Sequence, residues 1–183
     1  MNHPKNTALI AAFRNVETTV KTLAADGAIA AERALNAAIV NADITRGFEE
    51  YLALVDQYYA EDVEVSTDVS PDLLVGKQRL KSILLGFLVP LHIIAEMGGL
   101  WVSIHETPIP GDSLDEQHSE WSVELIGVTG RRVTRAWGTR RRWKQSRVVC
   151  EYHYAHRQDG EALSFDDLRI APPSDPDTEG RSR

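Results

Sequence analysis

The stretch "QYYAEDVEVS", residues 57–66, joins a helical pattern to a strand pattern. Ahead of it, apolar side chains such as Leu54 and Tyr58 recur at the three-to-four-residue spacing of one helix face. After it, Val63 and Val65 alternate with polar residues, which is the two-residue period of a half-buried strand. Because the period changes within this short stretch, the sequence predicts a helix followed closely by the first strand of a sheet.

Upstream of this junction the sequence predicts three helices. An apolar stripe at alternating steps of four and three residues over about 7–25 predicts an amphipathic helix, with Gly27 at its end. An alanine-rich helix is expected over about 28–41 and a third over about 45–59. Asp43, in the break "NADITRG" between them, is a candidate N-cap.

Downstream, "DVSPDLLVG" at 68–76 predicts a turn-rich link rather than a strand. A helix is expected from Lys77 to about Leu88, ended by Pro90, with no helix after it. Four strand patterns joined by short polar segments follow, at about 92–106, 118–128, 131–143 and 147–156. Strands connected by short turns pair antiparallel as a meander, so the element order predicts an α+β fold with helices on one face of a sheet.

The length of 183 residues fits one core-bearing domain with an additional arm. We expect an N-terminal helical arm over 1–27, a globular domain over 28–170 and a disordered tail over 171–183, which is proline-rich, polar and without periodicity. The composition, 43% hydrophobic and 26% charged, is typical of a soluble globular protein.

Charge and cysteine content argue against several classes of partner. The net charge of −7 disfavours nucleic acid, and the basic run at 131–147 is expected to form a solvated sheet face or to pair with the acidic segment at 49–72. No uninterrupted apolar run approaches the roughly 20 residues of a membrane span, and the N-terminal segment lacks the apolar block of a secretory signal, so we expect no membrane partner. The single cysteine, Cys150, cannot form an internal disulfide and is expected to be a plain core thiol. These observations predict a cytoplasmic protein.

Two segments resemble a known family. "YYAEDVEVSTDVSPDLLVGKQRLKSIL" at 58–84 is similar to the signature of the SnoaL-like, nuclear transport factor 2-like superfamily of cystatin-like α+β proteins, and "TRRRWKQSRVVCEYHY" at 139–154 resembles its closing hairpin. The resemblance covers roughly 28–157. It implies a curved antiparallel sheet wrapped around helices, a cone-shaped apolar pocket, and a homodimer through the outer sheet face, to which the N-terminal helix would add. It does not define a reaction, because the family contains enzymes of many kinds and non-enzymatic binders.

The family resemblance permits specific chemistry to be checked against this sequence. In the ketosteroid-isomerase branch the resemblance places the general base at Thr67 and the second acid at Thr139, and neither hydroxyl can replace a carboxyl group there. Asp68, next to Thr67, is expected on the opposite face. In the dehydratase branch a sheet histidine pairs with an aspartate, and this implies His153 or His105 as base with Asp43 as partner. Either histidine could instead be a structural or surface residue.

Strand alternation gives a candidate pocket lining. If Val65 and Thr67 face inward, the inward residues of the later strands are Trp137, Thr139 and Arg141, then Glu151, His153 and Ala155, unless a β-bulge reverses a strand. With Tyr59 at the pocket mouth, the expected lining is Tyr59, Thr67, Trp137, Thr139, Arg141 and Glu151. The charged members form either a polar patch in a pocket or a buried ion pair that orders the sheet.

No metal or cofactor site is expected. His153 and His156 are three residues apart on an expected strand, so their side chains should lie on opposite faces. Our first hypothesis is a protein that binds a small, largely apolar molecule and performs lyase, isomerase or cyclase chemistry, with His153 or His105 as base and Asp43 or Glu151 to orient it. The alternative is a non-catalytic binder or oligomeric accessory protein of the same fold.

Overall fold

The structure is a computed structural model that describes residues 27–44, 46–109 and 115–169. The expected arm at 7–25 and the tail at 171–183 lie outside the described residues and stay predictions. The elements, in chain order, are a helix over 27–41, α2 (Glu49–Tyr58), β1 (Tyr59–Thr67), β2 (Ser70–Val75), α3 (Lys77–Glu96), β3 (Leu100–Ile109), β4 (Glu116–Gly127), β5 (Arg132–Lys144) and β6 (Arg147–Asp159).

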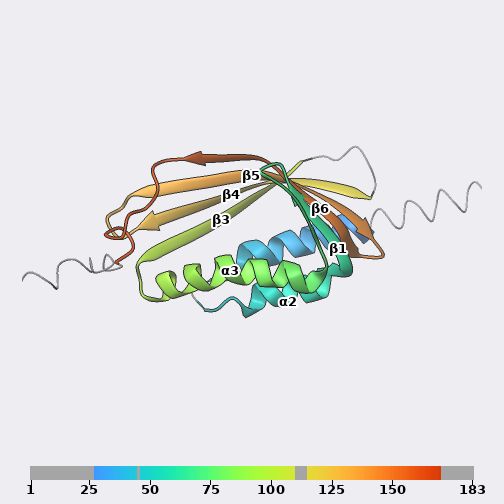
Figure 1. The fold of residues 1–183 in the computed structure, drawn as a ribbon, viewed down its shortest axis with the longest axis horizontal. Coiled ribbons are helices and arrows are strands. Elements are labelled where there is room, and N and C mark those ends of the chain that lie inside the picture. Colours follow the sequence, from blue (N-terminus) through green and yellow to red (C-terminus); the bar gives the residue numbers. More distant parts are fainter. Residues whose placement is uncertain (1–26, 45, 110–114, 170–183) are drawn as a thin grey trace, which may run out of the picture.

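The strands form one six-stranded sheet in the order β2-β1-β6-β5-β4-β3. The meander from β3 to β6 is antiparallel, as expected, and β1 pairs with β6 in parallel. The described helices lie together against one face of this sheet (Figure 1). The expected α+β class is therefore confirmed, with one parallel pair that the sequence did not predict.

The junction at 57–66 contains no intervening loop. Helix α2 ends at Tyr58 and β1 begins at Tyr59. The ring of Tyr58 packs edge-on against Trp143, with centroids 6.4 Å apart, and Tyr59 is buried. The change of period therefore marks the point where the helical layer becomes the sheet.

The prediction of a turn-rich link at 68–76 is wrong. Ser70–Val75 forms β2, which pairs antiparallel with β1. This strand lies at the edge of the sheet, where one side of the backbone needs no partner, so Pro71 is tolerated. Most residues of β2 are exposed, so its sequence does not show the alternation of a half-buried strand.

The predicted end, at Pro90, of the helix that begins at Lys77 is also wrong. Helix α3 continues through Pro90 to Glu96, and β3 starts at Leu100 rather than near residue 92. A proline inside a helix costs roughly 3 kcal/mol. Packing of Leu80 and Ala95 beneath the sheet stabilises the helix on both sides of this site.

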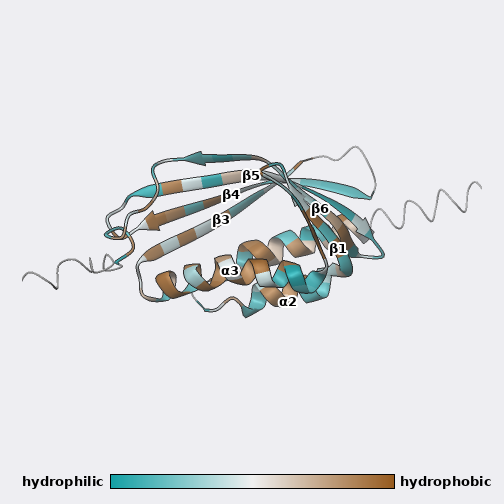
Figure 2. Ribbon diagram, viewed as in Figure 1, coloured by the Kyte–Doolittle hydropathy of each residue, from teal (hydrophilic) through white to brown (hydrophobic). Residues whose placement is uncertain are grey.

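Helix α3 is long and apolar enough, by length and composition only, to cross a membrane. A buried core helix of a soluble protein has the same length and composition, so these features are weak evidence for a membrane. Little of α3, however, is buried in this structure. Figure 2 shows its largely hydrophobic length. Ile83, Phe87 and Ile93 are exposed, and Phe87 reaches 65%.

The apolar core lies where α2 and α3 meet the paired strands β1 and β6. Val63 and Val148 are completely buried there, and Leu35 of the helix over 27–41 is 1% exposed. The remaining core members are Ala28, Val55, Tyr59, Leu74, Leu80 and Trp143. Polar side chains begin immediately beyond this core, along the face of the sheet that meets the helices.

Candidate functional site

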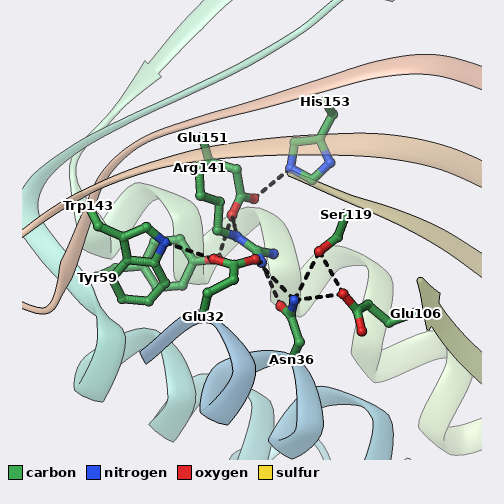
Figure 3. Close-up of polar contacts among 9 residues, drawn as sticks. All are labelled: Glu32, Asn36, Tyr59, Glu106, Ser119, Arg141, Trp143, Glu151 and His153. Carbon is green, nitrogen blue, oxygen red and sulfur yellow. Dashed lines mark hydrogen bonds and ion pairs between the residues drawn. The ribbon is translucent and has the colours of Figure 1, made fainter. Parts of the chain in front are cut away.

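The inner face of β5 and β6 carries buried polar residues. Thr139 and Arg141 are 1% and 3% exposed, and Glu151 is 4% exposed. Trp137 and His153 on the same face are half-buried. These are the side chains that alternation places inward. Figure 3 shows Arg141, Glu151 and His153 of this set together with Glu32 and Asn36 of the helical layer.

Arg141 lies between two carboxylates, one from each layer. Its Nη1 donates to Oε1 of Glu32 on the helix over 27–41 at 2.9 Å, and its Nε donates to Oε2 of Glu151. Tyr59 donates its hydroxyl to the same Oε2 of Glu151 at 2.7 Å, and Trp143 Nε1 donates to Oε2 of Glu32 at 2.8 Å. Both buried carboxylates are therefore paired and hydrogen-bonded, as burial of charge requires.

A second set of contacts extends this cluster along the same face toward the β3 edge of the sheet. Asn36 accepts from Arg141 Nη1 at 2.8 Å, and its Nδ2 lies 3.0 Å from Oε1 of Glu106 on β3 and from Oγ of Ser119 on β4. Ser119 donates to Glu106 at 2.6 Å. The cluster thus connects the helix over 27–41 to β3, β4, β5 and β6.

The charge states follow from these contacts. Burial alone would raise the pKa of Glu151, but the guanidinium of Arg141 and the hydrogen bonds from Arg141 and His153 hold that pKa well below its usual range. Burial raises the pKa of Tyr59 well above its ordinary value, although Arg141 opposes this. Glu151 is therefore ionised and Tyr59 is a neutral donor.

His153 is the partly exposed member of this cluster, with 26% of its side chain exposed. Its Nε2 lies 2.6 Å from Oε1 of Glu151. A neutral imidazole that donates one N–H to a carboxylate keeps a lone pair on its other nitrogen. The arrangement therefore fixes the orientation of a ring that can accept a proton.

A β-bulge in β6 places a second histidine beside the first. Ala155 has φ 53°, and the pairing of β5 with β6 shifts register across Trp137. The extra residue exposes Ala155, which alternation places inward, and returns His156 to the inner face, where it stacks on His153 with ring centroids 6.4 Å apart. The predictions for Ala155 and for opposite faces of the two histidines are wrong, because a bulge resets strand alternation.

His156 has polar neighbours from the end of β1. Its Nε2 lies 3.1 Å from Oγ1 of Thr67 and 3.7 Å from Oδ1 of Asp68. Asp68 also accepts from the backbone N–H of Ala155 at 2.6 Å. Asp68 was expected on the opposite face from Thr67, but it follows the end of β1, so its carboxylate reaches the same histidine and that expectation is wrong.

The other two candidate residues lie away from this cluster. His105 is exposed on β3, with Nε2 2.9 Å from Oγ of Ser103. Asp43 lines a separate surface hollow of about 310 Å³ beside Tyr51, and its charge adds to burial in raising the pKa of Tyr51 to about 12. The carboxylate beside His153 is Glu151. Among the described residues no group of three or more His, Cys, Asp or Glu side chains could hold a metal ion.

Sequence reasoning did not select Glu32, Asn36 or Trp143. The sequence did contain a signal for Glu32, because this residue falls on the spacing of the apolar positions Ala28 and Leu35 of its helix. A charged residue on the buried stripe of a helix needs a buried partner.

Many solved structures are similar to this fold at low sequence identity, and among them are proteins described as NTF2-like and as SnoaL-like. A provisionally assigned polyketide cyclase of Xanthomonas campestris is 15% identical, with a TM-score of 0.46 over 68% of this chain and 90% of its own. An LEH-like epoxide hydrolase of M. tuberculosis is 19% identical, with a TM-score of 0.44 over 70% of this chain and 82% of its own.

An NTF2-like protein of unknown function from Burkholderia pseudomallei is 15% identical, with a TM-score of 0.44 over 69% of this chain and 88% of its own. No protein-family model matches the sequence, and no curated protein matches it. At these identities the likeness concerns the fold alone, so a function has to be argued from the site.

Proposed function

We propose that the chain binds a small, largely apolar molecule against the inner face of the sheet and performs acid–base chemistry of the lyase, isomerase or cyclase type. The observation that carries the proposal is the contact of 2.6 Å between His153 Nε2 and Glu151 Oε1. A base must be oriented and must be paired with a group that stabilises its protonated form. Ionised Glu151 meets both requirements for His153.

The remaining members of the cluster position this pair. Arg141 and Tyr59 both donate to the Oε2 atom of Glu151, which leaves its Oε1 atom for His153. Glu32 and Asn36 hold the guanidinium from the helical layer. In this proposal His153 removes the proton, Glu151 orients and stabilises the imidazolium, and Arg141 keeps Glu151 ionised.

The reaction class can be tested before the natural substrate is identified. Lyase, isomerase and cyclase chemistry of this kind begins with removal of a proton from carbon, so the protein should exchange protons α to a carbonyl for deuterium in D2O. A set of small apolar ketones and esters, first shown to bind, would be incubated with the protein and analysed by mass spectrometry. We expect exchange to fall by roughly 10²- to 10⁴-fold in His153→Gln, the usual contribution of a general base.

His105→Gln is the matched control, because His105 is an exposed histidine of the same sheet whose hydrogen bond is to Ser103. It should exchange at the wild-type rate. Equal rates in wild type and His153→Gln, or no exchange with any compound that binds, would exclude His153 as a base and support the non-catalytic alternative.

The accessory-protein alternative is favoured by α3. A single chain leaves Ile83, Phe87 and Ile93 exposed on a largely apolar helix, and surfaces of this kind are typical of protein interfaces. We propose a homodimer, as the family resemblance implies, with the outer sheet face and the N-terminal segment as its expected contacts. Light scattering of the full chain against a chain that starts at Asp26 tests the contribution of the segment, and an unchanged mass would exclude it.

A further inference from the structure

Helix α3 carries an apolar stripe that the described part of the chain leaves exposed. Phe87 is 65% exposed, Ile93 50% and Ile83 44%. Steps of three and four residues place these side chains on one side of the helix. An exposed apolar surface of this kind is usually covered by a partner or by another segment of the protein. The complete stripe is Ile83, Gly86, Phe87, Pro90, Ile93 and Met97, which directly follows the helix.

The chain contains a second apolar stripe with the same spacing. In the N-terminal segment 7–25 the steps between apolar residues are four, three, four and three. Along α3, taken in the opposite direction from 97 to 83, the steps are also four, three, four and three. Each stripe covers a length of about 21 Å in a helix. Two helical stripes of equal length and spacing can pack against each other over their whole length. The apolar residues of the segment are Leu9, Phe13, Val16, Val20 and Leu23.

The segment joins the described structure beside the start of α3. Ala28, in the first turn of the helix over 27–41, is buried in the same apolar core cluster as Leu80 of α3. The joint before it is the dipeptide Asp26-Gly27. Aspartate is a preferred N-cap, and an Asp-Gly pair is typical of a change in chain direction. A segment that turns back at this joint runs antiparallel to α3, which is the direction that the matching steps require.

Charges at the two ends agree with this direction. Arg79 is exposed near the start of α3, and Glu96 is exposed at its end. In an antiparallel arrangement Asp26 would be at the Arg79 end and Lys5 near the Glu96 end. The parallel arrangement would bring like charges together. Exposed ion pairs contribute only about 0–1 kcal/mol each, so these charges favour one direction and the apolar stripes provide the contact.

We propose that residues 7–25 form a helix that packs antiparallel on α3 of the same chain, with Leu23 beside Ile83 and Leu9 beside Met97. A segment tied to the adjoining helix by a short joint is present at a high effective concentration, which favours it over a separate partner. This proposal does not depend on the chemistry proposed above. A homodimer would then use the outer sheet face rather than α3.

Disulfide formation in the full chain tests both the direction and the partner. Cys150→Ala first removes the free thiol. Leu9→Cys is then combined with Met97→Cys, and in a matched control with Ile83→Cys. Under oxidised glutathione the first pair should form a disulfide within one chain, which a non-reducing gel shows as a faster-migrating monomer. The control pair should stay reduced, because a disulfide needs Cα atoms within about 7 Å and these positions would be about 21 Å apart.

Proteolysis measures how firmly the segment is held. Trypsin cuts after Arg14 and Lys21, and a helix packed on α3 is cut only when it opens. Phe87→Asp puts a charge into the stripe and should speed both cuts by roughly 10- to 100-fold, the range that corresponds to burial of a phenylalanine side chain. Gln78→Asp, at an exposed position of α3 outside the stripe, is the control and should be cut within twofold of the wild-type rate.

Three results would overturn the proposal. A disulfide between two chains for the Leu9 and Met97 pair would place the segment on a second copy. Failure of this pair to form a disulfide, or equal yields with the control pair, would remove the antiparallel contact. Protection from trypsin that appears only when phosphatidylcholine vesicles are added would assign the stripe to a membrane surface. The disulfide test remains decisive if Phe87→Asp does not fold.

Discussion

Replacing Arg141 by methionine should reverse the way stability depends on pH. The substitution keeps most of the side-chain volume and removes the guanidinium that contacts Glu32, Asn36 and Glu151. Both carboxylates would then be buried without the guanidinium, and Glu151 would keep only His153 as a basic neighbour. We expect the variant to be much less stable than wild type at pH 7 and to recover part of that loss at lower pH.

The magnitude follows from the burial of the pair. The side chains of Arg141 and Glu151 are 4% and 6% exposed, so solvent hardly screens them. Removing one partner of a buried ion pair destabilises by about 3–5 kcal/mol, against a total stability of about 5–15 kcal/mol. With a urea dependence of about 2 kcal/mol per molar, the midpoint of unfolding should fall by roughly 2 M.

The sign of the pH effect differs between the two proteins. In wild type the pKa of Glu151 is lowered, so its contribution to stability is complete above its ordinary value of 4.5 and is lost as the pH falls below that value. In the variant the guanidinium no longer opposes burial and only His153 does, so we expect the pKa of Glu151 to rise and the folded state to bind a proton more tightly than in wild type. Between pH 7 and 5 the variant should therefore gain stability while wild type does not.

Urea unfolding followed by circular dichroism at pH 7, 6 and 5 measures both effects. Arg140→Met is the matched control, because Arg140 is the neighbouring arginine on the outer face, 45% exposed, with Glu116 3.6 Å away. Such an exposed pair contributes about 0–1 kcal/mol. If Arg141→Met is too unstable to fold at pH 7, its folding should still be detectable at pH 5. A loss below 1 kcal/mol, or the same pH slope in all three proteins, would refute this account of the cluster.

Three further outcomes follow from other parts of the fold. Asp167 is 2% exposed and accepts hydrogen bonds from Ser164 and Thr129, which lower its pKa to about 2. Asp167→Asn should therefore have a lower melting temperature than wild type at pH 7. This difference between the two melting temperatures should shrink as the pH falls from about 4 to 2. A side chain at Gly138 would meet the ring of Tyr154, so Gly138→Ala should lower the melting temperature. Combining Gly138→Ala with Tyr154→Ala should remove that clash. Thermal denaturation of the two single variants and the double variant tests this. If α3 lies in an oligomer interface, Phe87→Asp should reduce the mass measured by light scattering without lowering the melting temperature of the single chain, and an unchanged mass would exclude α3 from that interface.

Much of the fold could be predicted because its signals are local. The change of period at 57–66 and the long alternating strands after residue 116 need no knowledge of distant residues. The two wrong predictions, for β2 and for the end of α3, also came from reading local signals alone. β2 lies at an edge with few buried side chains, and α3 continues through Pro90 although a proline inside a helix is locally unfavourable.

The site was only partly predictable for a related reason. Thr139, Arg141 and Glu151 belong to regular stretches of strand, where alternation holds. His156 does not, because the bulge at Ala155 resets the alternation and β6 itself contains no glycine or proline to indicate it. Glu32 lies 109 residues before Arg141, and its role depends on how the helix over 27–41 docks on the sheet.

That docking has a consequence for the proposed chemistry. The cluster begins where the apolar core ends, and Trp143 belongs to both, since its ring packs in the core and its Nε1 donates to Glu32. Arg141 then connects Glu32 to Glu151, and Glu151 orients His153. Because each contact fixes the next, the direction of the imidazole is set by the position of the helix on the sheet. The buried ion pair therefore need not add stability in order to be useful, because its geometry orients the proposed base.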